Sequence, residues 1–310
     1  MSPPNVANFF LLGTSKGGTT SLHHYLSRHP AVLMSDPKEP SFFRAEYEKG
    51  LEYYADRYFH RYSGQKVIGD AAPQHLYLPY VARRIAESIA NPRFAVICRN
   101  PVDRAVSAYW HNVSRGIETR SFDDVIEQNL KRLAEGPRFE TEDEAGLYKD
   151  VLINKGNAEL QRRFGFYVEP GHYDELIGHY RSIFGNERVK VLFFEDLAAD
   201  PQRVADQLFA FLDLPSVPLG DARAQNEATS RTAARVFDLV GRIPGVASFS
   251  PRLRVAVKRM IGRRMRGNSE AKPSIGINAH RQLIEHYRDR NRRLAETTGR
   301  DLAHWDQMGP

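Results

Sequence analysis

The sequence contains little cysteine and no long apolar run, and both absences narrow what the chain can be. Its 310 residues include one cysteine, Cys98, so it can form neither an internal disulfide nor a zinc cluster of several thiolates. It nowhere approaches the roughly 18 consecutive apolar residues of a membrane-spanning helix, and its first residues lack the basic and then apolar pattern of a secretory signal. We therefore expect a cytoplasmic chain in which Cys98, within the apolar run Phe94–Cys98, is a small core residue.

The chain is basic. Its formal net charge is +6 and its isoelectric point is about 9.3, which favours anionic partners such as nucleotides, acidic glycans, nucleic acid or a membrane surface. Charge alone does not choose among them. Since 41% of the residues are hydrophobic, the chain can bury a substantial core, and we expect one domain over residues 1–310.

Short apolar runs alternate with longer helical stretches along much of the chain. The runs predict strands at Phe9–Leu12, Val32–Met34, Lys66–Asp70, Phe94–Cys98 and Val189–Phe194, and the stretches predict helices at about 21–26, 102–112, 201–212 and 278–298. Such alternation is typical of an α/β fold with a central parallel sheet flanked by helices on both faces. Ligands of these folds bind where the carboxyl ends of the strands meet the loops.

Two segments depart from this alternation. Residues 119–168 are polar and helical in pattern, and we interpret them as an insertion near the substrate. Residues 250–267 include seven basic side chains and no acidic one, from Arg252 to Arg266. This basic segment is either an amphipathic helix that meets an anionic membrane or substrate, or a solvated helix face.

The loop Gly13–Thr20 follows a predicted strand and opens a predicted helix. This arrangement points backbone N–H groups and the positive end of the helix at one spot, as in P-loop-like nucleotide sites. Its lysine precedes the glycine pair, whereas in a Walker loop the lysine follows the second glycine. The expected ligand-binding residues of the loop are Lys16, Gly17, Gly18, Thr19, Thr20 and Ser21.

A second anion site is predicted after the Phe94–Cys98 strand. Arg99 stands at the strand end and Ser107 lies two helical turns further on, so both side chains can share one phosphate. Arg104 is either a further ligand or a partner of Asp103 or Asp70 in a structural ion pair.

With these two motifs the sequence resembles the sulfotransferases that use 3′-phosphoadenosine-5′-phosphosulfate (PAPS). Lys16–Thr20 looks like the family's 5′-phosphosulfate motif, and Arg99 through Ser107 looks like its 3′-phosphate motif. The Lys-Gly-Gly-Thr form and the segment Pro37–Phe43 are similar to heparan-sulfate-type and bacterial carbohydrate sulfotransferases. The resemblance covers nearly the whole chain. This chain lacks the disulfide-tied loop of the animal glycan enzymes. It also has alanines at 71 and 72, near a position where those enzymes often carry a lysine. The resemblance therefore does not identify the acceptor molecule.

The resemblance implies that a sulfuryl group moves from PAPS to a hydroxyl, most readily that of a carbohydrate or glycolipid. A sulfuryl group carries less negative charge than a phosphoryl group, so Lys16 and helix-terminus amides are expected to suffice without a metal ion. The resemblance also implies that Glu39 is the general base. Asp70, at a strand end, is expected to orient the substrate or Lys16.

Histidine is the alternative base, as in aryl and steroid sulfotransferases. The available histidines are His23, His24, His29, His75 and His111. Around the adenine, we expect contacts from Asn226, Ser230 and Arg231, which lie where related enzymes fold a loop over the nucleotide.

Two other functions fit parts of the pattern. A kinase would use the same phosphate-binding loop, but it would depend on ATP and magnesium. A non-catalytic adaptor would bind nucleic acid or anionic lipid through residues 252–266, with strong salt dependence, and it would leave the two nucleotide motifs without a purpose. We therefore expect no nucleic-acid partner.

Overall fold

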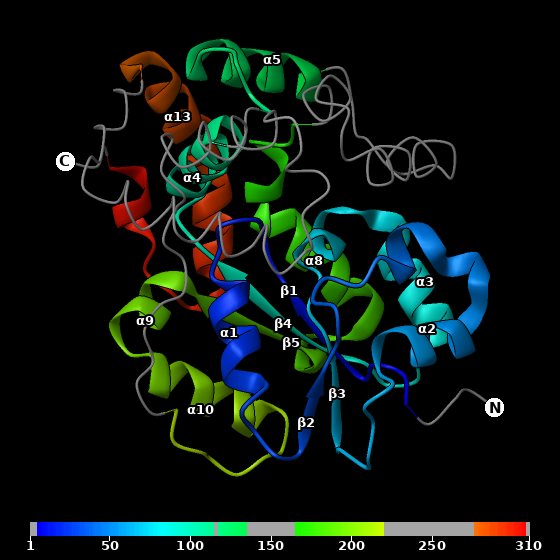
Figure 1. Cartoon of the computed structure of the whole chain (residues 1–310). Helices are drawn as coiled ribbons and strands as arrows, with labels where there is room; N and C mark the ends of the chain where they lie inside the picture. The colour runs from blue at the N-terminus through cyan, green and yellow to red at the C-terminus, as the bar shows by residue number, and fades with distance from the viewer. Residues whose placement is uncertain (1–4, 115–116, 135–164, 220–275, 308–310) are drawn as a thin grey trace, which may run out of the picture.

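The computed structural model describes residues 5–114, 117–134, 165–219 and 276–307. At its centre lies a five-stranded sheet in the order β2-β3-β1-β4-β5, and every neighbouring pair of strands is parallel. Figure 1 shows helices on both sides of this sheet. The strands are β1 (Phe9–Leu12), β2 (Val32–Met34), β3 (Val67–Asp70), β4 (Arg93–Cys98) and β5 (Val189–Phe193). The predicted α/β class is confirmed.

The two faces of the sheet carry separate hydrophobic clusters, because side chains alternate along a strand. Phe9 and Leu11 of β1 belong to one cluster, and Phe10 and Leu12 belong to the other. The Phe9 face is covered by α1 (Thr19–Leu26), α9 (Phe194–Ala199) and α10 (Pro201–Phe211).

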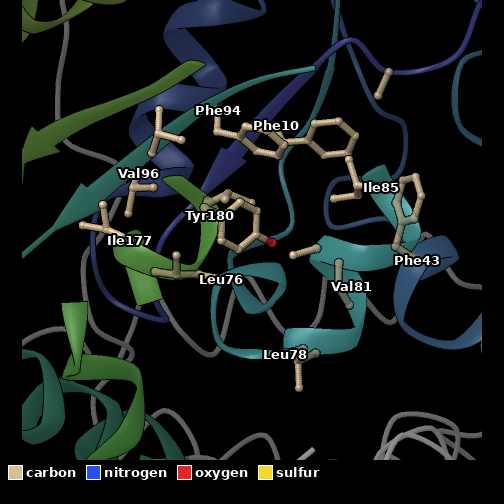
Figure 2. Packing of buried hydrophobic residues seen from close by; sticks show 14 of the residues in the cluster. Phe10, Phe43, Leu76, Leu78, Val81, Ile85, Phe94, Val96, Ile177 and Tyr180 are labelled. Atoms are coloured by element: carbon tan, nitrogen blue, oxygen red, sulfur yellow. The ribbon is translucent and has the colours of Figure 1, made fainter. Parts of the chain in front are cut away.

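The Phe10 face is covered by α2 (Gly50–Tyr58), α3 (Pro79–Ser88) and α8 (Tyr173–Phe184). Figure 2 shows Phe10 and Phe94 of the sheet beside Tyr180 of α8 and Ile85 of α3. The rings of Phe94 and Tyr180 meet edge to face, with their centroids 5.1 Å apart. Short helical turns complete this layer: η1 (Phe42–Glu46), η2 (Tyr47–Lys49) and η3 (Pro73–Tyr77). The turn η5 (Asn186–Arg188) connects α8 to β5.

A third cluster packs beside the sheet. It joins α4 (Pro101–Ser114), α5 (Phe122–Ala134) and α13 (Ile277–Thr298), which Figure 1 shows in its upper part. Tyr167 and Val168, just before η4 (Glu169–Gly171), belong to the same cluster. Tyr287 of α13 is fully buried and donates a hydrogen bond to the Val168 carbonyl over 2.7 Å. After α13, the turn η7 (Ala303–Asp306) buries Trp305 against the core.

The predicted elements occur with small changes at their ends. Phe194 was expected to close a strand but instead begins α9, because β4 ends at Cys98 and its last partner in β5 is Phe193. The predicted helix at 21–26 begins earlier, at Thr19. Cys98 is buried, as expected.

The structure describes only parts of the segments that bear on the expected domain organisation. Helix α5 lies within the expected insertion 119–168, whose middle is outside the described residues, as is the basic segment 250–267. The single domain over 1–310 stays a prediction. In the part of the chain that the structure describes, no helix has the length and apolarity needed to cross a bilayer.

Candidate active site

The loop after β1 has the shape expected of an anion cradle. The Gly17 amide donates to the Thr14 carbonyl over 3.0 Å, and Gly18 precedes the first residue of α1 in a left-handed conformation. A Cβ on Gly18 would lie 2.9 Å from the Phe194 ring, so only glycine fits between the loop and α9. The loop therefore runs directly into the positive N-terminal end of α1.

The structure brings the second motif to this loop. Arg99, after β4, donates from Nη1 to the Lys16 carbonyl over 3.0 Å. Its guanidinium also lies over the Phe194 ring, 4.8 Å from the centroid. Lys16 and Arg99 thus stand side by side although 83 residues separate them.

Tyr173 joins the same two loops from α8. Its hydroxyl accepts a hydrogen bond from the Arg99 amide over 3.3 Å and lies 3.4 Å from Thr14 Oγ1. Burial raises the pKa of Tyr173 to about 12, so the hydroxyl is neutral at physiological pH. No local pattern indicates this role, because Tyr173 lies 159 residues from Thr14.

Helix α4 begins just after Arg99 and is capped by Asn100. The Asn100 Oδ1 accepts from the amides of Val102 and Asp103 over 2.9 and 3.3 Å. Ser107 is half-buried on this helix, two turns beyond its start. Arg104 is almost completely buried and donates to the Tyr167 carbonyl, so this contact ties α4 to the segment just before η4 and involves neither Asp103 nor Asp70.

Glu39 lies next to α1, the helix that follows the loop after β1. Lys38 Nζ is 3.0 Å from Glu39 Oε1 and 3.3 Å from Oγ1 of Thr20, in the first turn of α1. Glu39 has a φ of 64°, an uncommon value for a residue with a side chain. Its carboxylate is 40% exposed, so it is open to an incoming substrate.

Asp70 ends β3 and is fully buried. Its Oδ2 accepts from the Tyr54 hydroxyl over 2.7 Å, while Oδ1 lies 3.9 Å from His75 Nδ1 and has no partner at hydrogen-bond distance among the described residues. Burial raises the pKa of Asp70 to about 7, although the Tyr54 hydrogen bond and the nearby Arg44 charge act in the opposite direction. The expected role of Asp70 in orienting substrate or Lys16 stays a prediction.

The alternative histidine bases differ in their surroundings. His75 is fully buried, and burial lowers its pKa well below the usual value. His29 is held by the Ala31 amide and the Pro215 carbonyl. The pKa of His23 falls to about 4 through burial and the positive charge of Lys38, so His23 is a neutral and weak base near Glu39.

Three predicted nucleotide contacts cannot be placed. Asn226, Ser230 and Arg231 lie outside the described residues. Among the residues that are described, no three histidine, cysteine or carboxylate side chains are grouped so as to hold a metal ion. The expectation of a metal-free reaction stays a prediction.

The model of the sulfotransferase domain family matches residues 7–234. This chain belongs to the sulfotransferase family. The match includes the loop after β1, the Glu39 segment and the Arg99 motif, so the resemblance found in the motifs is confirmed.

Curated relatives extend over much of this sulfotransferase. A membrane-associated sulfotransferase, kil1, of Dictyostelium discoideum is 27% identical over 71% of this chain and 58% of that protein. Heparan sulfate glucosamine 3-O-sulfotransferase 3B1 of Mus musculus is 26% identical over 98% of this chain and 69% of that protein. The chain thus spans about three fifths to two thirds of the length of these relatives.

A solved structure supports the fold. The sulfotransferase from Alicyclobacillus acidocaldarius has a TM-score of 0.61 and 24% sequence identity, over 97% of this chain and 99% of that one. At this identity the likeness concerns the fold alone.

Proposed function

We propose that this sulfotransferase moves a sulfuryl group from PAPS to a hydroxyl of a carbohydrate or glycolipid, without a metal ion. One observation carries the proposal: the hydrogen bond from Arg99 to the Lys16 carbonyl joins the two anion-binding motifs. PAPS carries its 5′-phosphosulfate and its 3′-phosphate on one ribose. A ligand with two separate anionic groups therefore suits two adjoining anion sites.

Each end of the donor has its own set of residues in this proposal. Lys16, the amides of Gly18 and Thr19 and the hydroxyls of Thr20 and Ser21 bind the 5′-phosphosulfate, while Gly17 closes the loop through its bond to Thr14 and lets the ligand approach the backbone. Arg99 and Ser107 bind the 3′-phosphate, Arg99 through a charge-assisted hydrogen bond.

Glu39 acts as the general base. It accepts the proton of the acceptor hydroxyl while the hydroxyl oxygen attacks sulfur, and the bond from sulfur to the bridging phosphate oxygen breaks. The electron pair of that bond leaves with 3′-phosphoadenosine-5′-phosphate (PAP). Lys16 stabilises the negative charge that grows on the bridging oxygen, an interaction that is strongest in the transition state.

The carbohydrate acceptor is supported by the mouse relative, which is a heparan sulfate glucosamine 3-O-sulfotransferase, and by the net charge of +6, which favours acidic glycans. The expected contact of residues 252–266 with an anionic membrane or substrate stays a prediction. So does the cytoplasmic location.

The test is an acceptor screen with radiolabelled PAPS, run on the wild type and on Glu39→Gln. We expect label on a glycan or glycolipid, and a rate on the best acceptor that is lower by about 10²- to 10⁴-fold in the variant, the usual contribution of a general base. Glu52→Gln, at an exposed position of α2, is the control and retains the full rate.

Three outcomes would contradict parts of the proposal. Full activity of Glu39→Gln would exclude Glu39 as the base. Phosphoryl transfer from ATP that stops on chelation would favour a magnesium-dependent kinase, and binding to nucleic acid without any transfer would favour an adaptor.

A further inference from the structure

Lys38 contacts both halves of the candidate site. Its Nζ lies 3.3 Å from Thr20 Oγ1 and 3.0 Å from Glu39 Oε1. Thr20 is part of α1, the helix that follows the donor loop, Gly13–Thr20. The hydroxyl and the carboxylate are therefore within two hydrogen-bond lengths of one another. Such a separation suits a base that must reach a hydroxyl attacking a group held at the loop.

The backbone of Glu39 is fixed independently of Lys38. Arg44, buried in η1, donates from Nη2 to the carbonyls of Glu39 and Pro40 over 3.3 and 3.1 Å. The Ser41 amide donates to the Tyr58 hydroxyl over 3.2 Å. These contacts hold the unusual φ of 64° at Glu39 and leave its side-chain torsions to be set by another group.

The charges around Glu39 single out Lys38. Arg44 faces the backbone of Glu39, and the buried Asp70 acts on it only through space. His23 also feels both Lys38 and Glu39, but its pKa of about 4 leaves it uncharged near neutrality. Lys38 is in direct contact with the carboxylate, with Nζ 3.0 Å from Oε1.

An ordinary surface ion pair would have little effect, since exposed pairs contribute about 0–1 kcal/mol. The pair of Arg61 and Asp36 is of this kind: the two side chains are 3.0 Å apart and 61% and 52% exposed. Lys38 is only 23% exposed and has a second contact, Thr20. These two features distinguish it from the outer pair formed by Arg61 and Asp36.

We propose that Lys38 is a positioning residue for sulfuryl transfer, which aligns the Glu39 carboxylate with the donor loop through its bridge to Thr20. Lys38 acts in this way only if the proposed function holds. Its effect passes through Glu39, so it is distinct from the electrostatic role of Lys16.

The experiment combines steady-state kinetics with a double-mutant cycle. In Lys38→Met we expect kcat to fall by about 10- to 100-fold, the scale of a misplaced catalytic group, while the Kd for PAP changes by less than about threefold. Lys38→Arg retains the charge and the hydrogen bonds, and we expect it to recover most of kcat. Arg61→Met removes the same unit of charge from the outer pair and keeps the wild-type rate.

The cycle tests whether Lys38 acts through Glu39. In the Glu39→Gln background, measured under single-turnover conditions, Lys38→Met is expected to lower the rate by less than about twofold, because coupled residues are not additive. An equal loss in both backgrounds, or a loss of PAP affinity as large as the loss of kcat, would overturn the proposal and place Lys38 on the donor itself. A wild type that transfers nothing from PAPS would instead refute the proposed function.

Discussion

The donor side and the acceptor side of the candidate site are built differently. On the donor side, the Arg99 guanidinium donates to the Lys16 carbonyl and the Arg99 amide donates to the Tyr173 hydroxyl, so Arg99 connects the loop after β1 to the start of α8. On the acceptor side, several buried polar atoms have no hydrogen-bond partner among the described residues. They are Ser35 Oγ, Arg44 Nε, Asp70 Oδ1 and both ring nitrogens of His75, and Asp70 Oδ1 lies 3.9 Å from His75 Nδ1. On the donor side, His23 Nε2 and Arg104 Nε are in the same condition.

This difference has an energetic meaning. A buried polar atom without a partner costs about 1–3 kcal/mol, and such costs concentrate at functional sites. We infer that the fold itself joins the two donor motifs, whereas the acceptor side, where more of these atoms gather, retains the larger free-energy cost within the native state. The following three predictions test this difference, from the largest expected effect to the smallest.

Lys16→Met should remove a positive charge from the donor side and leave the conformation of the loop unchanged. The loop is held by backbone contacts, namely the Gly17 amide on Thr14 and Arg99 on the Lys16 carbonyl, which the substitution preserves. We expect kcat to fall by about 10²- to 10³-fold, the usual cost of removing one group that stabilises transition-state charge.

The measurement is the initial rate of transfer from PAPS, with thermal unfolding as the check on folding. Lys49→Met is the matched control. Lys49 lies outside the loop, its Nζ is 2.9 Å from Glu46 Oε1, and its side chain is 46% exposed. Unfolding of Lys16→Met at a much lower temperature than the wild type would show that the loop is not pre-formed by its backbone.

Asp70→Asn should reveal the cost retained on the acceptor side. The pKa of Asp70 is about 7 in the folded protein, against an ordinary value of 3.8. Between these two pH values the native state keeps the Asp70 proton and the unfolded chain has lost it. The contribution of Asp70 to the free energy of unfolding is therefore most favourable below about pH 4 and is lost as the pH rises through 7. Between pH 5 and 8, this carboxyl should lower the free energy of unfolding by about 2 kcal/mol.

Urea unfolding of the wild type and of Asp70→Asn at pH 5 and pH 8 measures this contribution. The wild type is expected to lose about 2 kcal/mol more than the variant over that interval. Parallel losses in the two proteins would mean that the Asp70 carboxyl is ionised at a much lower pH, and that it contributes no such cost.

Ser107→Ala should have the smallest effect. The proposed contact of Ser107 with the 3′-phosphate is a single hydroxyl hydrogen bond, worth about 1 kcal/mol, so we expect the affinity for PAP to fall by about fivefold. Isothermal titration calorimetry with PAP measures the change, and adenosine 5′-phosphosulfate, which lacks the 3′-phosphate, should bind the two proteins equally. An equal loss for both ligands would remove Ser107 from the 3′-phosphate site.

Much of the fold was predictable because it depends on local patterns. The strands that end near Leu12 and Cys98 are short apolar runs followed by loop residues, and the helices that follow them have their own periodicity. The end of β5 was not predictable, because Phe194 is as apolar as Phe193. Only the length of the neighbouring strand β4 decides where pairing stops.

The candidate site shows the same division. The left-handed turn at Gly18 and the lysine before it are visible in the sequence. The burial of Asp70 under Tyr54 is not, since a strand-end aspartate reads as a residue that faces solvent or ligand. Likewise, the sequence offers Lys38 only as the neighbour of Glu39, and its contact with Thr20 depends on how β2 is placed beside α1.

The sequence alone thus determined the parallel α/β architecture and the positions of the Gly13–Thr20 loop and Arg99 at the ends of strands, because each follows from residues that are close together in the chain. Tertiary structure decided which distant groups meet: Tyr173 with Thr14 and Arg99, and Lys38 with Thr20. The physical reason is that hydrogen bonds between side chains act over about 3 Å. Packing of the helices on the sheet sets such distances, and no local pattern records them.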